Sequence, residues 1–306
     1  MKVMVFDVGG TEIKYSVMDE QMHRTDSGAV PTPQDTQAQF LDTLYGLYAP
    51  HKDEVTGIAM ALPGFVDNRT GYVSNGGALL YNTATPVGQL LAEKCGCPVI
   101  LENDGKAAAM AELANGALKG CCNAAVFIIG TGVGGGIIAN GQLVRGVHFT
   151  AGEYSFVNTN AEAWDAPDQN MACQCSTRNL LIWYRARKAL PEDAPLDGRS
   201  FFAAANTGEP EALEVLRRFS HAVAVQIFNL TVLLDVEKVA IGGGISKQPL
   251  LLESLRSAYD WLFTSRAGQA YMEGLPRCQI VPCAFSSEAN QVGVAAAYFE
   301  AMQKKC

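Results

Sequence analysis

The clearest chemical signal in this sequence is a set of short glycine turns, each placed directly after a run of apolar residues. The turns are Gly9-Gly10, Gly130-Thr131-Gly132 and Gly242-Gly243-Gly244. Because glycine has no Cβ, the N–H groups of such a turn can come close to the oxygen atoms of a phosphate. The turns therefore indicate a nucleotide held between two lobes, although an ordinary tight turn would give the same pattern at any one position.

Two familiar phosphate motifs are excluded by the residues that surround these turns. Gly130-x-Gly132-x-x-Gly135 has the dinucleotide spacing, but the segment after it, Ile137-Ile138-Ala139 and an Asn-Gly turn, is strand-like where a helix is required. The pair Gly105-Lys106 is followed by Ala107, where a P-loop needs Ser or Thr. We therefore expect neither a Rossmann fold nor a P-loop.

The segments that carry the turns alternate between strands and helices, which is typical of an α/β protein. Short apolar runs predict strands at 3–8, 13–18, 55–61, 99–101, 124–129 and 239–241. Helical spacing and capping signals predict helices at 35–48, 86–95 with Thr85 as N-cap, 105–118, 209–234 and 290–303. The order strand, Gly/Thr turn, strand occurs twice, at 6–13 and 129–138, and this weak repeat predicts two related lobes.

Composition narrows the class of protein. The 306 residues suggest two domains, and 48% apolar residues are enough for a sizeable core. A net charge of −8 has the wrong sign for binding nucleic acid or a membrane surface through phosphates. No segment reads as a membrane span or a secretory signal, and the nine cysteines suit reduced thiols, so we expect a cytosolic protein without disulfides.

Five motifs follow one another along nearly the whole chain. They are Asp7-Val8-Gly9-Gly10-Thr11-x-x-Lys14, Leu62-Pro63-Gly64-Phe65-Val66-Asp67, Glu102-Asn103-Asp104, Gly130-Thr131-Gly132-x-Gly134-Gly135-Gly136 and Ala151-Gly152-Glu153. Together they resemble the ROK family of sugar kinases and sugar-responsive repressors. The resemblance implies an actin-like ATPase fold of two ribonuclease-H-like lobes with ATP and a sugar in the cleft. We expect lobes at 1–118 and 119–289, with helix 290–306 packing back onto the first.

The resemblance also implies roles around a sugar. Asp104 would be the general base that takes the proton from the sugar 6-hydroxyl as that hydroxyl attacks the γ-phosphate of ATP. By its position alone, between a strand and a helix, Asp104 also fits an N-cap. Asn103 and Glu153 would bind other sugar hydroxyls, and Gly64 would let the sugar approach the backbone.

A second group of residues would hold the nucleotide. By resemblance, Asp7 helps to hold Mg²⁺ through water, while Gly9, Gly10 and Thr11 face the phosphates of ATP. Lys14 either adds positive charge there or projects into solvent. In the second lobe, Thr131 and Gly132 would contact phosphate, and Gly242 and Gly243 would lie near the ribose or adenine.

The chain departs from the family at a structural zinc site. Many members use a histidine and three cysteines, but here Phe156 stands in place of the histidine and only Cys173 and Cys175 remain of the cysteines. A structural zinc normally takes four protein ligands, so we expect ATP and Mg²⁺ but no zinc.

The same departure bears on the sugar, because Phe156 and Ile182 stand where the family has polar contacts near the anomeric end. Their loss removes discrimination against a substituent there. We therefore expect a kinase for a β-glucoside or an N-acylmannosamine. The alternative is a catalytically inactive, sugar-responsive regulator of the same family. The resemblance further implies a homodimer, and Lys106 is expected to face solvent.

Overall fold

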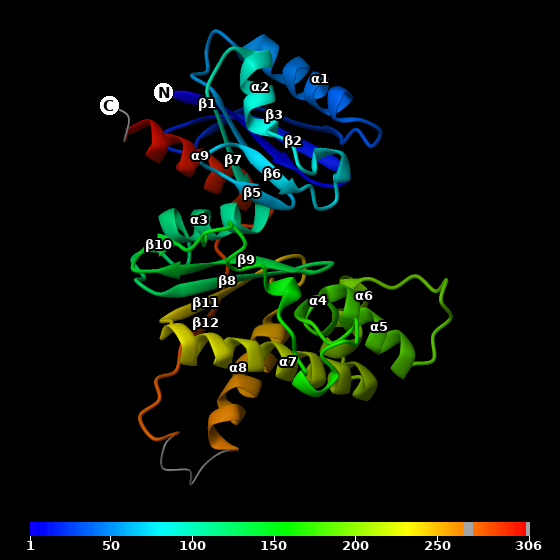
Figure 1. The fold of residues 1–306 in the computed structure, drawn as a ribbon. Helices are drawn as coiled ribbons and strands as arrows, with labels where there is room; N and C mark the ends of the chain where they lie inside the picture. The colour runs from blue at the N-terminus through cyan, green and yellow to red at the C-terminus, as the bar shows by residue number, and fades with distance from the viewer. Residues whose placement is uncertain (266–271, 304–306) are drawn as a thin grey trace. The chain divides into compact units, whose positions relative to one another are not determined.

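The computed structural model describes residues 1–265 and 272–303, which form two compact units (Figure 1). Of the described residues, 1–115, 145–151 and 287–303 form the first unit, and 116–144, 152–265 and 272–286 form the second. The chain therefore enters the first unit three times. Residues 145–151, which the sequence analysis assigned to the second lobe, are part of the first unit.

The first unit is built on a five-stranded sheet in the order β3-β2-β1-β4-β7. Its strands are β1 (Lys2–Val8), β2 (Glu12–Asp19), β3 (Arg24–Pro31), β4 (Ile58–Leu62) and β7 (Val99–Asn103). Strands β1, β4 and β7 are parallel, and their register pairs Asp7 with Ala61 and Leu62 with Asn103. Because parallel strands end at the same edge, the residues that follow all three lie near one another.

Helices and a small hairpin complete the first unit. They are α1 (Gln37–Tyr48), η1 (Ala49–His51), η2 (Leu80–Asn82), α2 (Val87–Cys95), α3 (Asp104–Asn115), α9 (Ala289–Gln303) and the hairpin of β5 (Phe65–Asp67) and β6 (Tyr72–Asn75). A Cβ on Gly293 of α9 would overlap the carbonyl oxygen of Ala107 on α3, so glycine allows these two helices to pack closely. This contact brings the start of α9 beside the end of β1.

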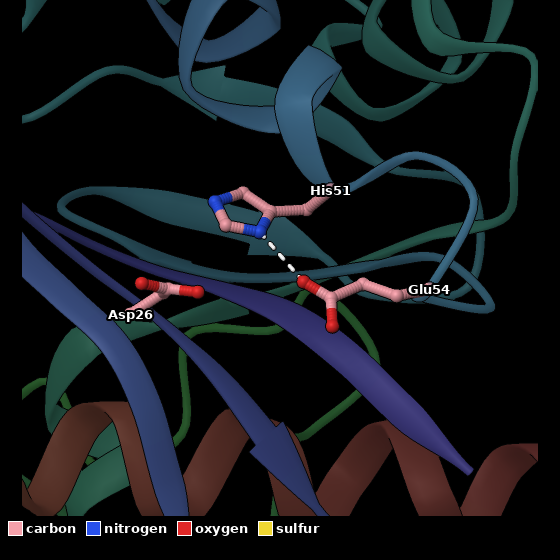
Figure 2. A group of neighbouring side chains, drawn as sticks. All are labelled: Asp26, His51 and Glu54. Atoms are coloured by element: carbon pink, nitrogen blue, oxygen red, sulfur yellow. Dashed lines mark hydrogen bonds and ion pairs between the residues drawn. The ribbon is translucent and has the colours of Figure 1, made fainter.

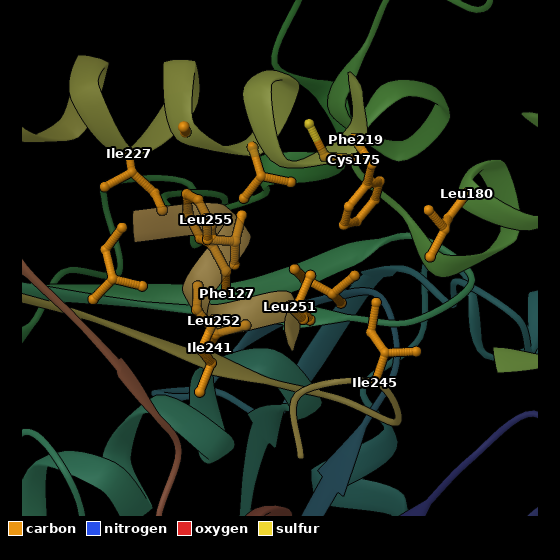
Figure 3. Close-up of a cluster of buried hydrophobic side chains, with 14 of the residues drawn as sticks. Phe127, Cys175, Leu180, Phe219, Ile227, Ile241, Ile245, Leu251, Leu252 and Leu255 are labelled. Carbon is orange, nitrogen blue, oxygen red and sulfur yellow. The ribbon is translucent and has the colours of Figure 1, made fainter. Parts of the chain in front are cut away.

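The second unit has a sheet in the order β10-β9-β8-β11-β12. Its strands are β8 (Ala124–Ile129), β9 (Val133–Ala139), β10 (Gln142–Leu143), β11 (Lys238–Gly242) and β12 (Gln279–Pro282). The helices are η3 (Tyr154–Phe156), η4 (Ala161–Ala163), α4 (Met171–Gln174), α5 (Thr177–Arg187), α6 (Gly198–Asn206), α7 (Pro210–Leu234) and α8 (Pro249–Thr264). Phe127, Ile241, Phe219 and Leu255 lie in the apolar core between the sheet and its helices (Figure 3).

The two sheets share one design, in which an antiparallel meander is extended by two further parallel strands. Each sheet contains one hairpin whose two strands are joined by a glycine turn, β1–β2 in the first and β8–β9 in the second. The next strand of the meander flanks this hairpin on one side, and a parallel strand flanks it on the other. This confirms the repeat predicted from the sequence. Among the described residues, no helix is both long and apolar enough to cross a membrane.

Candidate active site

Asp7 lies at the carboxyl end of β1 and is 9% exposed. Its Oδ1 accepts a hydrogen bond of 2.9 Å from Nδ2 of Asn290, at the start of α9. Lys14 is its cross-strand partner on β2. Burial raises the pKa of the Asp7 carboxyl, while the hydrogen bond from Asn290 and the charge of Lys14 oppose that rise. The charge of Lys14 therefore acts on the Asp7 carboxyl.

Polar contacts within the first unit fix the backbone of the first glycine turn, Gly9-Gly10. The N–H of Gly9 donates to the carbonyl oxygen of Glu12 at 2.9 Å. Thr32 Oγ1 donates to the Gly9 carbonyl, and Gln34 Nε2 donates to the Gly10 carbonyl, both at 2.8 Å. These bonds hold the carbonyl groups of Gly9 and Gly10 in place.

Asn103, the last residue of β7, joins two parts of the predicted sugar site. Its Nδ2 donates to the carbonyl oxygen of Gly64 at 3.0 Å, and its Oδ1 accepts from the N–H of Lys106 at 3.1 Å. The second bond is an N-cap for α3, so the capping role considered for Asp104 belongs to Asn103. Gly64 has φ of +98°, and a Cβ there would overlap the carbonyl of Asn75.

Asp104 is the first residue of α3 and is half-buried. Its Oδ1 accepts from the N–H of Gly105 at 2.7 Å. A carboxylate in the first turn of a helix is stabilised by the partial positive charge of the helix N-terminus. Asp104 is therefore held at the start of α3 with one carboxylate oxygen engaged by the backbone.

Glu102, the residue before Asn103 in the sequence, lies in a cluster of buried charged side chains. Glu102 is completely buried, and Arg145 Nε and Nη2 both lie 2.8 Å from its Oε2. Its Oε1 accepts from the N–H of Asn103 at 3.1 Å. Lys106 is only 1% exposed, so the expectation that it faces solvent is wrong. Burial raises the pKa of Glu102, whereas the positive charges of Arg145 and Lys106 oppose the rise.

The second unit brings its own two glycine turns together. β8 and β11 are parallel neighbours with Gly242 opposite Ile128, so the turns after them are adjacent. Gly243 has φ of +95°, and a Cβ there would overlap the carbonyl of Ile129. The predicted residues Thr131, Gly132, Gly242 and Gly243 therefore share one edge of this sheet.

Glu153 directly precedes the short helix η3, which is docked on β9 of the same unit. The hydroxyl of the buried Tyr154 donates to the carbonyl of Gly136 at 3.1 Å, and its ring packs edge-on against Phe127. Ser155 contacts Val133, the residue that follows the second glycine turn. Sequence analysis identified Glu153 but none of these supports.

The residues that remain of the family's zinc motif do not suit a zinc ion. Cys175 is completely buried within the apolar cluster of Figure 3, and burial raises its pKa to about 12. Zinc binds the thiolate, which this surrounding disfavours. Cys173 Sγ instead lies 3.7 Å from the carbonyl oxygen of Pro167.

Within the described residues, one group of side chains has the geometry for a metal ion, namely Asp26, His51 and Glu54 (Figure 2). His51 Nδ1 is already 2.7 Å from Glu54 Oε1, and Lys2 Nζ donates to Glu54 Oε2 at 3.1 Å. Lys2 begins β1, whereas Asp7 is near its end, about 16 Å away at the usual rise of a strand. This group is therefore separate from the predicted nucleotide site.

A cavity of about 910 Å³ lies among α5, α7 and α8 in the second unit. Trp183, Arg218, His221 and Trp261 contribute to its lining. Arg218 stacks on Trp183 at 3.7 Å from the ring centroid. None of the site residues predicted from the sequence lines this cavity.

Comparison with known proteins gives these residues a context. A β-glucoside kinase of Klebsiella pneumoniae is 30% identical over 265 residues, covering 85% of this chain and 88% of that protein. The crystal structure of a ROK family protein from Streptococcus pneumoniae in complex with sucrose matches with a TM-score of 0.87 and 27% identity, over 99% of this chain and all of the other. A ROK family glucokinase from Streptomyces griseus, in complex with glucose and AMPPNP, matches with a TM-score of 0.79 and 25% identity, over 97% and 99% of the two chains.

These matches extend over both units, including the strands that end at the predicted site residues. The fold is α/β and is that of the actin-like ATPases, with two ribonuclease-H-like units. The model of the ROK family matches residues 3–303. The chain therefore belongs to the ROK family.

Proposed function

We propose that this protein is a carbohydrate kinase that transfers the γ-phosphoryl group of ATP to the 6-hydroxyl of a hexose or hexose derivative. The observation that carries the proposal is the common edge at which β1, β4 and β7 end. That edge brings together Asp7, Gly64, Asn103 and Asp104. The names of its ROK relatives, a β-glucoside kinase and a glucokinase, agree with this chemistry.

Asp104 is the proton acceptor in this mechanism. As the 6-hydroxyl oxygen forms its bond to the γ-phosphorus, the bond from that phosphorus to the bridging oxygen breaks and ADP leaves. The hydroxyl proton passes to a carboxylate oxygen of Asp104, at the N-terminus of α3. Asn103 orients the sugar while its own side chain is fixed by Gly64 and Lys106.

The nucleotide is held by the glycine turns of both units in this proposal. Gly9, Gly10 and Thr11 face the phosphates, to which Gly10 and Thr11 offer backbone N–H groups, and Lys14 adds positive charge. Thr131 and Gly132 contact phosphate, whereas Gly242 and Gly243 lie near the ribose or adenine. The carboxylate of Asp7 suits Mg²⁺ held through water, since oxygen is the ligand that Mg²⁺ prefers. Bound there, Mg²⁺ would supply positive charge that offsets the negative charge of the phosphates.

The substrate class follows from the two apolar replacements. Phe156 is 71% exposed and Ile182 is 49% exposed, so neither is required by the core. An apolar side chain in place of a polar sugar contact tolerates a substituent at the anomeric oxygen. We propose a β-glucoside as the substrate, with an N-acylmannosamine as the second candidate. A preference for glucose of tenfold or more in kcat/KM over both would contradict this part of the proposal.

Release of ADP from MgATP should be measured with glucose, N-acetylglucosamine, N-acetylmannosamine, fructose and the β-glucoside cellobiose. The 6-deoxy form of the best sugar serves as the control, because it can bind but lacks the attacking hydroxyl. Turnover with a sugar and none with its 6-deoxy form is the expected result. Sugar binding without turnover would instead favour the alternative, an inactive sugar-responsive regulator.

We also propose that the protein is a homodimer in the cytoplasm. The dimer rests on family membership, and the location rests on nine cysteines in a chain long enough to fold without disulfides. Light scattering during size-exclusion chromatography would measure the mass of the particle against the 32.7 kDa of one chain.

A further inference from the structure

The loop that carries Glu153 and the turn Gly130–Gly132 are joined by one hydroxyl group. Ser155 Oγ accepts a hydrogen bond of 3.0 Å from the N–H of Val133 and donates one of 3.1 Å to the carbonyl of the same residue. Val133 begins β9 directly after the turn. Ser155 lies two residues after Glu153. A single side chain thus fixes both backbone polar groups at the base of the turn.

The turn is shaped to accept this hydroxyl. A Cβ on Gly132 would lie 2.9 Å from Ser155 Oγ, which is closer than real side chains approach one another. Glycine at position 132 therefore leaves room for Ser155 as well as for a phosphate. The contact is specific to the hydroxyl group, because alanine at position 155 could neither donate nor accept a hydrogen bond.

On its other side the same turn is held by a different element. Thr177, the first residue of α5, donates its N–H to the carbonyl of Gly130 at 2.9 Å and its Oγ1 to the carbonyl of Ile129 at 3.3 Å. The helix α5 does not carry Glu153. Of these two supports, Ser155 is therefore the one on the predicted sugar loop.

We propose that Ser155 is a positioning residue that couples the sugar carboxylate Glu153 to the phosphate turn Gly130–Gly132. The hydroxyl of Ser155 already holds Val133 before a sugar binds. A sugar held by Glu153 restrains the loop further, so that Ser155 keeps the turn in the form that meets the phosphate. The inference rests on the proposed function. By linkage, sugar must tighten nucleotide binding by the same factor as nucleotide tightens sugar binding.

The test is the coupling factor, defined as the ratio of the Kd of MgAMPPNP without sugar to its Kd with the most active sugar of the panel at saturation. Calorimetry should give a factor of about 5 or more for the wild type, and Ser155→Ala should bring that factor close to 1. Ser155→Thr, which keeps the hydroxyl, should restore it. Thr177→Val is the matched control: it removes the Oγ1 hydrogen bond to the carbonyl of Ile129, the residue just before the same turn, but should leave the coupling factor unchanged.

Several results would overturn the proposal. If Ser155→Ala weakens MgAMPPNP equally with and without sugar, or if Thr177→Val lowers the coupling factor as much, Ser155 is only structural. A wild type that turns over sugar without any coupling would also refute it. Ser155→Gly is a second variant should alanine unfold the loop, and thermal denaturation identifies such a case. Absence of sugar-dependent ADP release from the wild type overturns the proposed function itself.

Discussion

Replacing Arg145 by methionine should destabilise the protein by about 2–3 kcal/mol at neutral pH. Removing one partner of a buried ion pair typically costs about 3–5 kcal/mol, because the other charge is left without compensation in a poorly solvated place. The expected cost lies at or below the lower end for two reasons. The Arg145 side chain is 28% exposed, so water can partly replace it. Lys106 also remains near Glu102 and still favours the ionised carboxylate.

The loss should depend on pH in a defined direction. Burial raises the pKa of Glu102 in the folded protein above its ordinary value of 4.5, so the stability linked to this group is greatest below pH 4.5 and falls as pH rises through the folded-state pKa. Without Arg145 that pKa rises further, because a charge that lowered it is gone. The difference in stability between the wild type and Arg145→Met should therefore be large at pH 7.5 and smaller at pH 5.

Urea unfolding followed by circular dichroism at both pH values measures this difference. Arg69→Met is the matched control, since Arg69 is a mostly exposed arginine of the same unit that pairs with Asp67, and its loss should cost about 0.5 kcal/mol or less. The double variant Glu102→Gln with Arg145→Met should recover most of the stability. An equal loss at pH 7.5 and pH 5, or no recovery in the double variant, would refute the reasoning.

Three further outcomes follow from contacts around the site. Asn290→Ala removes a hydrogen bond that favours the ionised form of Asp7, so the pKa of Asp7 should rise. The acid limb of the pH profile of kcat/KM for MgATP should then move to higher pH. An unmoved limb would contradict the role of Asp7 at the nucleotide. Gly243→Ala should lower the free energy of unfolding by about 1–3 kcal/mol, because the new Cβ would overlap the Ile129 carbonyl at a residue with positive φ. Unchanged urea unfolding would show that the turn adjusts freely. Treatment with EDTA should leave the free energy of unfolding unchanged, and a clear loss on chelation would mean that a metal stabilises the fold. Cys175→Ala should lower the free energy of unfolding by about 1–2 kcal/mol, because the buried side chain loses packing contacts.

The parts of the fold that sequence could predict are those encoded by local patterns. Buried strands were found because an apolar run ends in glycine. The repeated Gly/Thr turn predicted that the two sheets would have the same strand arrangement. The strand Arg24–Pro31 was missed, because its side chains are mostly exposed and it has no apolar pattern to detect. The helix predicted at 209–234 is present as α7, but its apolar spacing does not reveal that Val232 and Leu233 are 53% and 76% exposed.

The supports of the site lay beyond sequence reasoning for another reason. Asn290 reaches Asp7 across 283 positions, and Arg145 reaches Glu102 across 43. No local pattern encodes such pairs. Lys106 was assigned to solvent because lysine is usually exposed, and the neighbouring Glu102 carboxylate is one charge that offsets the buried ammonium group there.

The central claim is that Asp104 accepts the proton of the sugar hydroxyl. It is tested most directly by Asp104→Asn, with calorimetry of sugar binding and ADP release measured on the same preparation. The variant should bind the sugar within about threefold of the wild type and lose at least about 100-fold in kcat, since a positioned general base contributes about 10²–10⁴-fold. A variant that keeps more than a tenth of the wild-type kcat while binding the sugar normally would contradict the account.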